Sequence, residues 1–175
     1  MSSSFEAQLQ EHLQRHRTEG ILLDTNVLLL LLIAQLQPAL IGDKRLEKYT
    51  REDAEMLCRF VGQFSRILTT THILAETSSL AAQALSGKFK ADFFKQLFPL
   101  FCTDTQAAFH KCSVDGNRVE EAIFVRLGLT DASLVATVES GRLLLTDDMD
   151  LHLAVISKES PSINFTHMRE AAGLL

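Results

Sequence analysis

Short apolar runs alternate along this chain with longer stretches of helical character, and this alternation limits the folds open to it. Residues 20–23 (GILL), 66–72 (RILTTTH) and 142–146 (RLLLT) are typical of buried strands, and residues 162–165 (SINF) predict a fourth. A helical pattern follows each run. Strands that alternate with helices form parallel sheets with right-handed crossovers, so we predict an α/β fold.

The chain has the length and composition of one globular domain. It contains 175 residues, 46% hydrophobic, with no linker or low-complexity segment. We therefore predict a single domain over residues 1–175, in which residues 1–19 form a helical or partly ordered lead-in. The apolar run at 27–34 is too short to span a membrane, and the N-terminus lacks the apolar core of a secretory signal. We expect a cytoplasmic protein without membrane contact.

Acidic residues stand where the predicted strands give way to helices. Asp24 follows the first strand, Glu76 lies in the helix after the second, Asp131 stands at a helix start, and Asp148 and Asp150 follow the third strand. Ligand sites in open α/β sheets form outside the carboxyl ends of the strands, so we expect the first and third of these strands to be neighbours. Carboxylates that converge there, without histidine or cysteine at zinc spacing, indicate a Mg²⁺-type ion and phosphate chemistry.

These motifs resemble those of PIN-domain nucleases over nearly the whole chain. The resemblance rests on LDTNVLL at 23–29, Glu76 in a helix after a strand, LTDA at 129–132 and LLTDDMDL at 144–151, in the order of that family. It implies a three-layer α/β/α sandwich around a central parallel sheet of four to five strands.

The resemblance also implies roles for individual residues. It makes an acidic quartet the ligands of one or two Mg²⁺ or Mn²⁺ ions, adds one further acid, and gives two small polar residues the task of orienting the acids. The quartet is Asp24, Glu76, Asp131 and Asp148; the further acid is Asp150; the orienting residues are Asn26 and Thr146.

Simpler explanations exist for several of these acids. Asp131 could be a helix N-cap, and we expect Thr130 or Asp131 to cap the helix that follows. A solvated turn with a capping function also explains the acids at 147, 148 and 150, and for Asp147 we prefer that interpretation. Glu76, taken alone, could be a surface residue of its helix.

The resemblance implies phosphodiester hydrolysis, with RNA as the usual substrate of small single-domain members, often toxins held by an antitoxin. This chain is longer than those toxins, chiefly through residues 37–66 and 86–118. A basic cluster in the first of these insertions is a candidate for contacting substrate phosphate, although the formal net charge is −5. The cluster consists of Lys44, Arg45, Lys48 and Arg51.

We therefore expect a metal-dependent endoribonuclease, with an antitoxin or other inhibitor protein and a homodimer as possible assemblies. Two alternatives stay open. One is a PIN-like interaction module that does not cut nucleic acid, against which the complete acidic set argues. The other is a nuclease for structured DNA, although such relatives usually carry additional acids and a helical arch.

Overall fold

The sheet has the predicted α/β organisation. The computed structural model describes residues 2–103, 105–106 and 108–175, and in this part the strands follow the order β3-β4-β2-β1-β5-β6. They are β1 (Ile21–Leu23), β2 (Ile67–Thr70), β3 (Thr105–Gln106), β4 (Phe109–Cys112), β5 (Leu143–Thr146) and β6 (Ser162–Asn164). Every pairing is parallel except that of β3 with β4.

Strand β1 lies between β5, its predicted neighbour, and β2. Leu22 of β1 is in register with Leu144 of β5 on one side and Leu68 of β2 on the other. All three strands are buried along their whole length, as expected for a sheet covered on both faces. The expectation that the strands before Asp24 and at Thr146 are neighbours is confirmed. Both residues therefore emerge at the same edge of the sheet.

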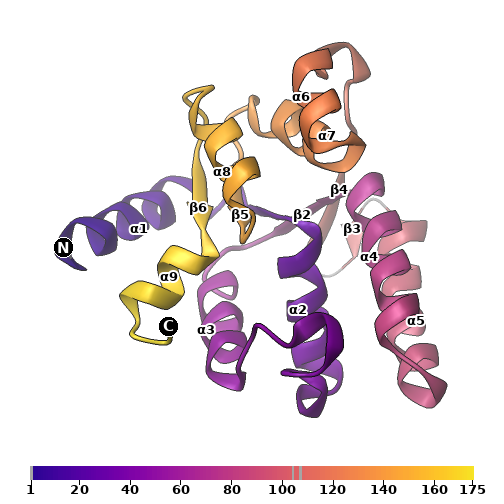
Figure 1. Cartoon of the computed structure of the whole chain (residues 1–175). Helices are drawn as coiled ribbons and strands as arrows, with labels where there is room; N and C mark the ends of the chain where they lie inside the picture. The colour runs from indigo at the N-terminus through magenta and orange to yellow at the C-terminus, as the bar shows by residue number, and fades with distance from the viewer. Residues whose placement is uncertain (1, 104, 107) are drawn as a thin grey trace.

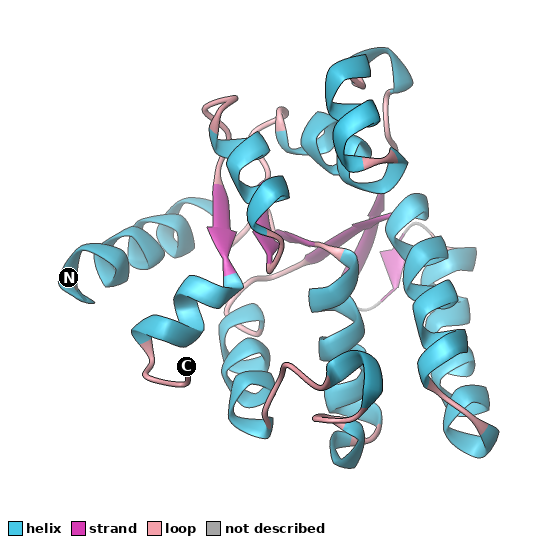
Figure 2. Ribbon diagram, in the orientation of Figure 1, coloured by secondary structure: helices cyan, strands magenta, loops and turns pink. Residues whose placement is uncertain are grey.

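Helices cover both faces of the sheet, which makes the fold the predicted three-layer α/β/α sandwich (Figures 1 and 2). One group consists of α2 (Thr25–Leu36), α3 (Arg51–Val61), α4 (Thr71–Ala84) and α5 (Gly87–Cys102). The group on the other side consists of α6 (Glu121–Leu127), α7 (Leu129–Val138) and α8 (Met149–Ile156). The remaining helices, α1 (Ser2–His16) and α9 (Phe165–Ala171), lie toward the β6 end of the sheet (Figure 1).

The β3–β4 end of the sheet was not predicted. Phe109–Cys112 reads FHKC, with two polar residues in the middle and every position half-buried, so it lacks both the apolar run and the alternation that indicate a strand. It becomes a strand because β2 offers a free edge with which it pairs in parallel from Phe109 to Cys112. The second insertion thus extends the sheet through α5 and β4.

Helix α2 fixes the position of Asp24. Its residues from Val27 to Ile33 are all buried, so the helix is apolar around its whole circumference and packs against α3 and α4. Each fully buried leucine contributes about 1.5–3 kcal/mol relative to an exposed one, which holds the start of the helix rigidly. No helix in the described ranges is both long enough and apolar enough to cross a lipid bilayer.

Helix α3 begins at a capping box. The Thr50 hydroxyl accepts from the Asp53 amide at 3.2 Å, and the Asp53 carboxylate accepts from the Thr50 amide at 2.8 Å. Two 3₁₀ turns, η1 (Pro38–Leu40) and η2 (Lys44–Leu46), precede this helix, and a third, η3 (Gly116–Arg118), precedes α6. The capping box therefore determines where the segment containing Lys48 and Tyr49 ends.

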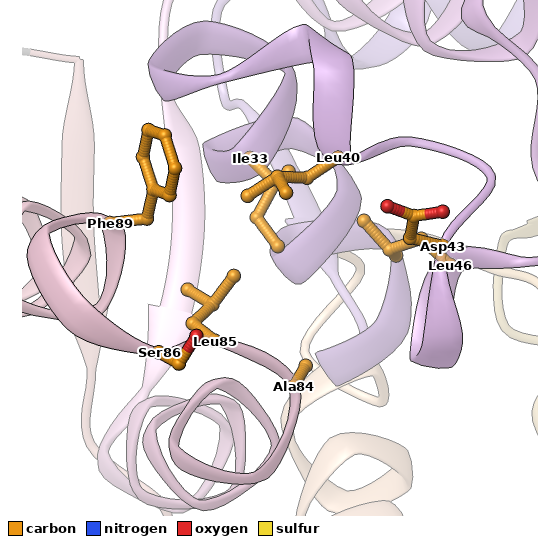
Figure 3. Close-up of a pocket in the computed structure, with 8 residues that line it drawn as sticks. All are labelled: Ile33, Leu40, Asp43, Leu46, Ala84, Leu85, Ser86 and Phe89. Carbon is orange, nitrogen blue, oxygen red and sulfur yellow. The ribbon is translucent and has the colours of Figure 1, made fainter.

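A small apolar cavity of about 90 Å³ lies at the far end of α2 (Figure 3). Ile33, Leu40, Leu46, Leu85 and Phe89 supply most of its lining, together with Asp43, Ala84 and Ser86. Ile33 is nine residues along α2 from Asp24, which corresponds to about 14 Å at 1.5 Å per residue. This cavity is separate from the acidic residues at the start of the helix.

Candidate functional site

Asp24 is held in place by three hydrogen bonds at the carboxyl end of β1. It is the N-cap of α2, and its Oδ1 accepts from the Val27 amide at 2.7 Å. Its Oδ2 accepts from the Asp147 amide at 3.1 Å and from the hydroxyl of Thr146, the residue expected to orient an acid. Asp24 is only 4% exposed. Its carboxylate is therefore fixed before any ligand binds.

Asp24 and Asp147 form a buried pair, as we shall call these two residues. Burial, and next the charge of Asp147, raise the pKa of Asp24 to about 7 from its ordinary 3.8. The hydrogen bonds from Thr146 and the two amides act in the opposite direction, but they do not cancel that effect. Because the two negative charges repel each other, a positive charge beside them is favourable.

The preferred interpretation of Asp147 as part of a solvated turn is wrong. Its side chain is 3% exposed, and its Oδ2 accepts from the Tyr49 hydroxyl and pairs with the Lys48 ammonium. Burial and the charge of Asp147 raise the pKa of Tyr49, so its hydroxyl remains a donor. The Asp147 side chain is buried because Lys48 and Tyr49, in the segment before α3, lie against it. Partners 98 residues apart along the chain leave no local signal.

Glu76, Asp131 and Asp148 lie together beside the buried pair, and we call them the open group. Burial, and then the charges of Asp148 and Glu76, raise the pKa of Asp131 to about 6. Glu76 is exposed on α4, and its Oε2 accepts from the hydroxyl of Thr25, the residue after Asp24, at 3.2 Å. The predicted quartet is thus gathered at one edge of the sheet.

The capping explanations hold for some of the acids and fail for others. Helix α7 begins at Leu129 with Gly128 as its N-cap, and no side chain makes the cap hydrogen bond. The expectation that Thr130 or Asp131 caps this helix is wrong, because the positive φ of Gly128 lets the chain turn into the helix two to three residues earlier. Asp148 does cap α8, accepting from the Leu151 amide at 3.0 Å.

Two further predicted residues stand at the margin of the site. Asp150 is exposed on the first turn of α8, and Asn26 is half-buried on the first turn of α2. Within the described part of the chain, neither makes a hydrogen bond to the quartet. Their predicted roles stay predictions.

One member of the basic cluster reaches the acids. The Lys48 ammonium pairs with Asp147 and lies 5.1 Å from the centre of the Tyr49 ring. Arg45 and Arg51 are exposed on the same segment, and the side chain of Lys44 lies outside the described part of the structure. The first insertion therefore brings a positive charge directly to the buried pair.

The oxygen donors of these acids are of the chemical type that binds a hard divalent cation. Mg²⁺ typically binds one or two carboxylates and completes its octahedron with water and substrate phosphate oxygens, so it needs no closed protein cage. Among the described residues, no group of three or more His, Cys, Asp or Glu side chains is arranged so that it could hold a metal ion. The buried Oδ1 of Asp147 makes no hydrogen bond there either. An unpartnered carboxylate oxygen and mutually repelling acids are both stabilised by a cation.

Comparison of this chain with protein-family models and with curated proteins finds no match. The resemblance to PIN-domain nucleases therefore rests on the motifs and their order alone, and it stays a prediction.

Proposed function

We propose that this protein is a divalent-metal-dependent endonuclease. The observation that supports it best is the gathering of Asp24, Glu76, Asp131 and Asp148 at the carboxyl edge of the sheet, with the pKa values of Asp24 and Asp131 raised. Structural capping alone does not account for this arrangement, since Asp131 caps nothing and Glu76 comes from the second turn of α4. Clustered acids with raised pKa values are typical of functional sites.

In this proposal the acids hold one or two Mg²⁺ or Mn²⁺ ions, and Asp150 assists from the rim. Such ions lower the pKa of a bound water and stabilise the charge on the attacked phosphate and the leaving oxygen. Thr146 keeps Asp24 oriented through its hydroxyl, and Asn26 has the same predicted task at the start of α2. The protein supplies no covalent nucleophile.

The substrate part of the proposal is RNA, and it follows from the family resemblance. The basic cluster supports a nucleic-acid substrate: Lys48 lies at the acids, and Arg45 and Arg51 are exposed on the same segment. Lys44 completes this cluster in the sequence. Structured DNA is the competing substrate, and cleavage assays distinguish the two directly.

The partner part of the proposal is a homodimer, or a complex with an antitoxin or other inhibitor protein. Helix α5 supports a protein partner, because Phe98 and Phe101 are 66% and 52% exposed. With Leu74, Phe94 and Leu97 they line an apolar groove between α4 and α5. A toxin role is one form of this proposal, and a non-cutting interaction module would use the same groove.

The experiment compares the wild type with Asp24→Asn on labelled single-stranded RNA, transfer RNA and DNA, each with Mn²⁺, Mg²⁺ or EDTA. Asparagine also caps helices well, so the variant should keep the start of α2. We expect metal-dependent RNA cleavage by the wild type only. Cleavage of DNA alone would mean that the substrate is DNA and not RNA. No cleavage, together with no metal-induced rise in melting temperature, would favour the interaction module.

A further inference from the structure

The carboxylate of Asp147 is half satisfied. Its Oδ2 has two partners, the Tyr49 hydroxyl and the Lys48 ammonium, whereas its Oδ1 is buried without a partner in the part of the chain that the structure describes. A buried carboxylate oxygen left unpaired costs free energy that a positively charged ligand would recover. The Asp147 backbone amide donates to Asp24 at 3.1 Å. The unpaired oxygen therefore belongs to a residue in direct contact with Asp24.

The Lys48 ammonium is placed so that it can leave. The Lys48 side chain is 51% exposed, although the carboxylate that it pairs with is 3% exposed. A lysine carries its charge on a flexible four-carbon stem, so the ammonium can move into solvent without disturbing the core. If it leaves, Tyr49 still donates to the same oxygen.

The backbone beneath Lys48 is fixed, in contrast to its side chain. The Arg169 guanidinium donates to the Lys48 carbonyl at 2.7 Å and to the Asp53 carboxylate at 2.8 Å. Asp53 is fully buried and also forms the capping box of α3. The Arg169 guanidinium lies 5.5 Å from the centre of the Tyr49 ring. This anchoring keeps Tyr49 at Asp147, so that only the lysine side chain is free to exchange.

We propose that Lys48 is a built-in competitor for the metal: its ammonium occupies Asp147 until a divalent cation binds to Asp24 and Asp147 and displaces it. Asp147 thereby becomes an additional metal-binding acid, beside the predicted quartet and Asp150. The released ammonium, still tethered at the site, faces the solvent from which substrate phosphate arrives. This inference deepens the proposed function, since it rests on the same metal site.

The test is the dissociation constant for Mn²⁺, measured by isothermal titration calorimetry at pH 7.5 without nucleic acid. Lys48→Met removes the competitor, so we expect it to bind Mn²⁺ about five- to tenfold more tightly than the wild type. Lys48→Arg keeps the positive charge and should bind within about twofold of the wild type. Asp147→Asn should bind at least about tenfold more weakly.

Lys158→Met is the matched control, because Lys158 also pairs with a carboxylate, that of Glu120, but beyond the far end of α8. It should leave the Mn²⁺ affinity unchanged. A Lys48→Met affinity equal to or weaker than that of the wild type overturns the inference. If Asp147→Asn does not fold, the comparison of Lys48→Met with Lys48→Arg decides by itself.

The readout separates this inference from the nuclease function. Metal-dependent cleavage without tighter Mn²⁺ binding by Lys48→Met would leave the nuclease in place and overturn the competitor role. Tighter binding by the variant without any cleavage would support the competitor and remove the nuclease function. If neither the wild type nor Lys48→Met binds Mn²⁺, both proposals fail.

Discussion

The buried pair and the open group lie at the same edge of the sheet, but they differ in burial and in the groups that offset their negative charges. The side chains of Asp24 and Asp147 are almost inaccessible and receive hydrogen bonds from amides and hydroxyls, and Lys48 pairs with Asp147. In the open group, Asp131 is half-buried and Glu76 and Asp148 are exposed. No lysine or arginine of the described residues forms an ion pair with these three.

The difference indicates that the two groups have different roles within one site. The buried pair is preorganised, because its oxygens are fixed by groups whose own positions depend on the core. The three carboxylates of the open group repel one another, and water or a bound ligand can offset this repulsion. If both groups bind the same metal ions, a substitution in either group should abolish metal-dependent cleavage. The two groups should nevertheless respond differently to pH and to the loss of packing around them.

The largest expected effect tests whether both groups belong to one site. Asp24→Asn and Asp131→Asn should each lower kcat/KM for metal-dependent RNA cleavage by about 10³-fold, because each removes a charged oxygen that stabilises the ion-bound transition state. The measurement is single-turnover cleavage with Mn²⁺. Asp92→Asn, which alters an exposed pair with Lys95 on α5, is the control and should retain full activity. An active Asp131→Asn would restrict the site to the buried pair.

The next effect tests the packing that anchors Lys48 and Tyr49 at the buried pair. Arg169→Met leaves Asp53 as a buried carboxylate without its guanidinium partner, which should lower the free energy of unfolding by about 3–5 kcal/mol. Urea unfolding followed by circular dichroism measures it. Arg59→Met breaks an exposed pair with Glu55 and should cost less than about 1 kcal/mol. Equal losses in the two variants would contradict the anchoring of the segment that carries Lys48.

The pH dependence of the metal-free protein should follow the buried pair. The folded-state pKa of Asp24, about 7, lies above its ordinary 3.8, so the native state holds this proton more tightly than the unfolded chain does. The stability that results is present below about pH 4 and is lost as the pH rises through about 7. Asp131 adds the same trend up to about pH 6. The melting temperature in EDTA should therefore fall by several degrees between pH 5 and pH 8.

Asp24→Asn should make that curve flatter, because asparagine does not titrate. Added Mn²⁺ should restore most of the melting temperature at pH 8 and little at pH 5, since the ion competes with protons for the same oxygens. An equally steep curve in the variant would assign the pH dependence to other groups.

The smallest expected effect concerns Lys48 and the nucleic acid. One lost phosphate contact should reduce the slope of log binding constant against log salt concentration by about 0.7 for single-stranded RNA. We expect this change for Lys48→Met in an Asp131→Asn background, which slows cleavage and leaves the buried pair intact. Fluorescence anisotropy between 50 and 200 mM salt gives the slope. Lys158→Met should leave the slope unchanged. An unchanged slope for Lys48→Met would show that Lys48 does not contact a phosphate.

The amino-acid sequence by itself determined the alternation of strands and helices, the parallel pairing of the strands at residues 20–23 and 142–146, and the capping box at Thr50. These features depend on local patterns: apolar runs of strand length, helical periodicity, and side chains that bond to amides three residues away. The order of the four acids along the chain was visible for the same reason, because three of them stand next to a strand end or a helix start and Glu76 lies in the helix that follows a strand.

Only the tertiary structure decided how the charges in the site are balanced. The burial of Asp147 depends on Lys48 and Tyr49, and the position of those two residues depends on Arg169, which is 121 residues from the carbonyl that it holds. Strand β4 likewise exists because β2 offers it an edge. Contacts of this kind arise when distant segments pack together, and the free energy that selects them comes from burial and pairing rather than from any local sequence pattern.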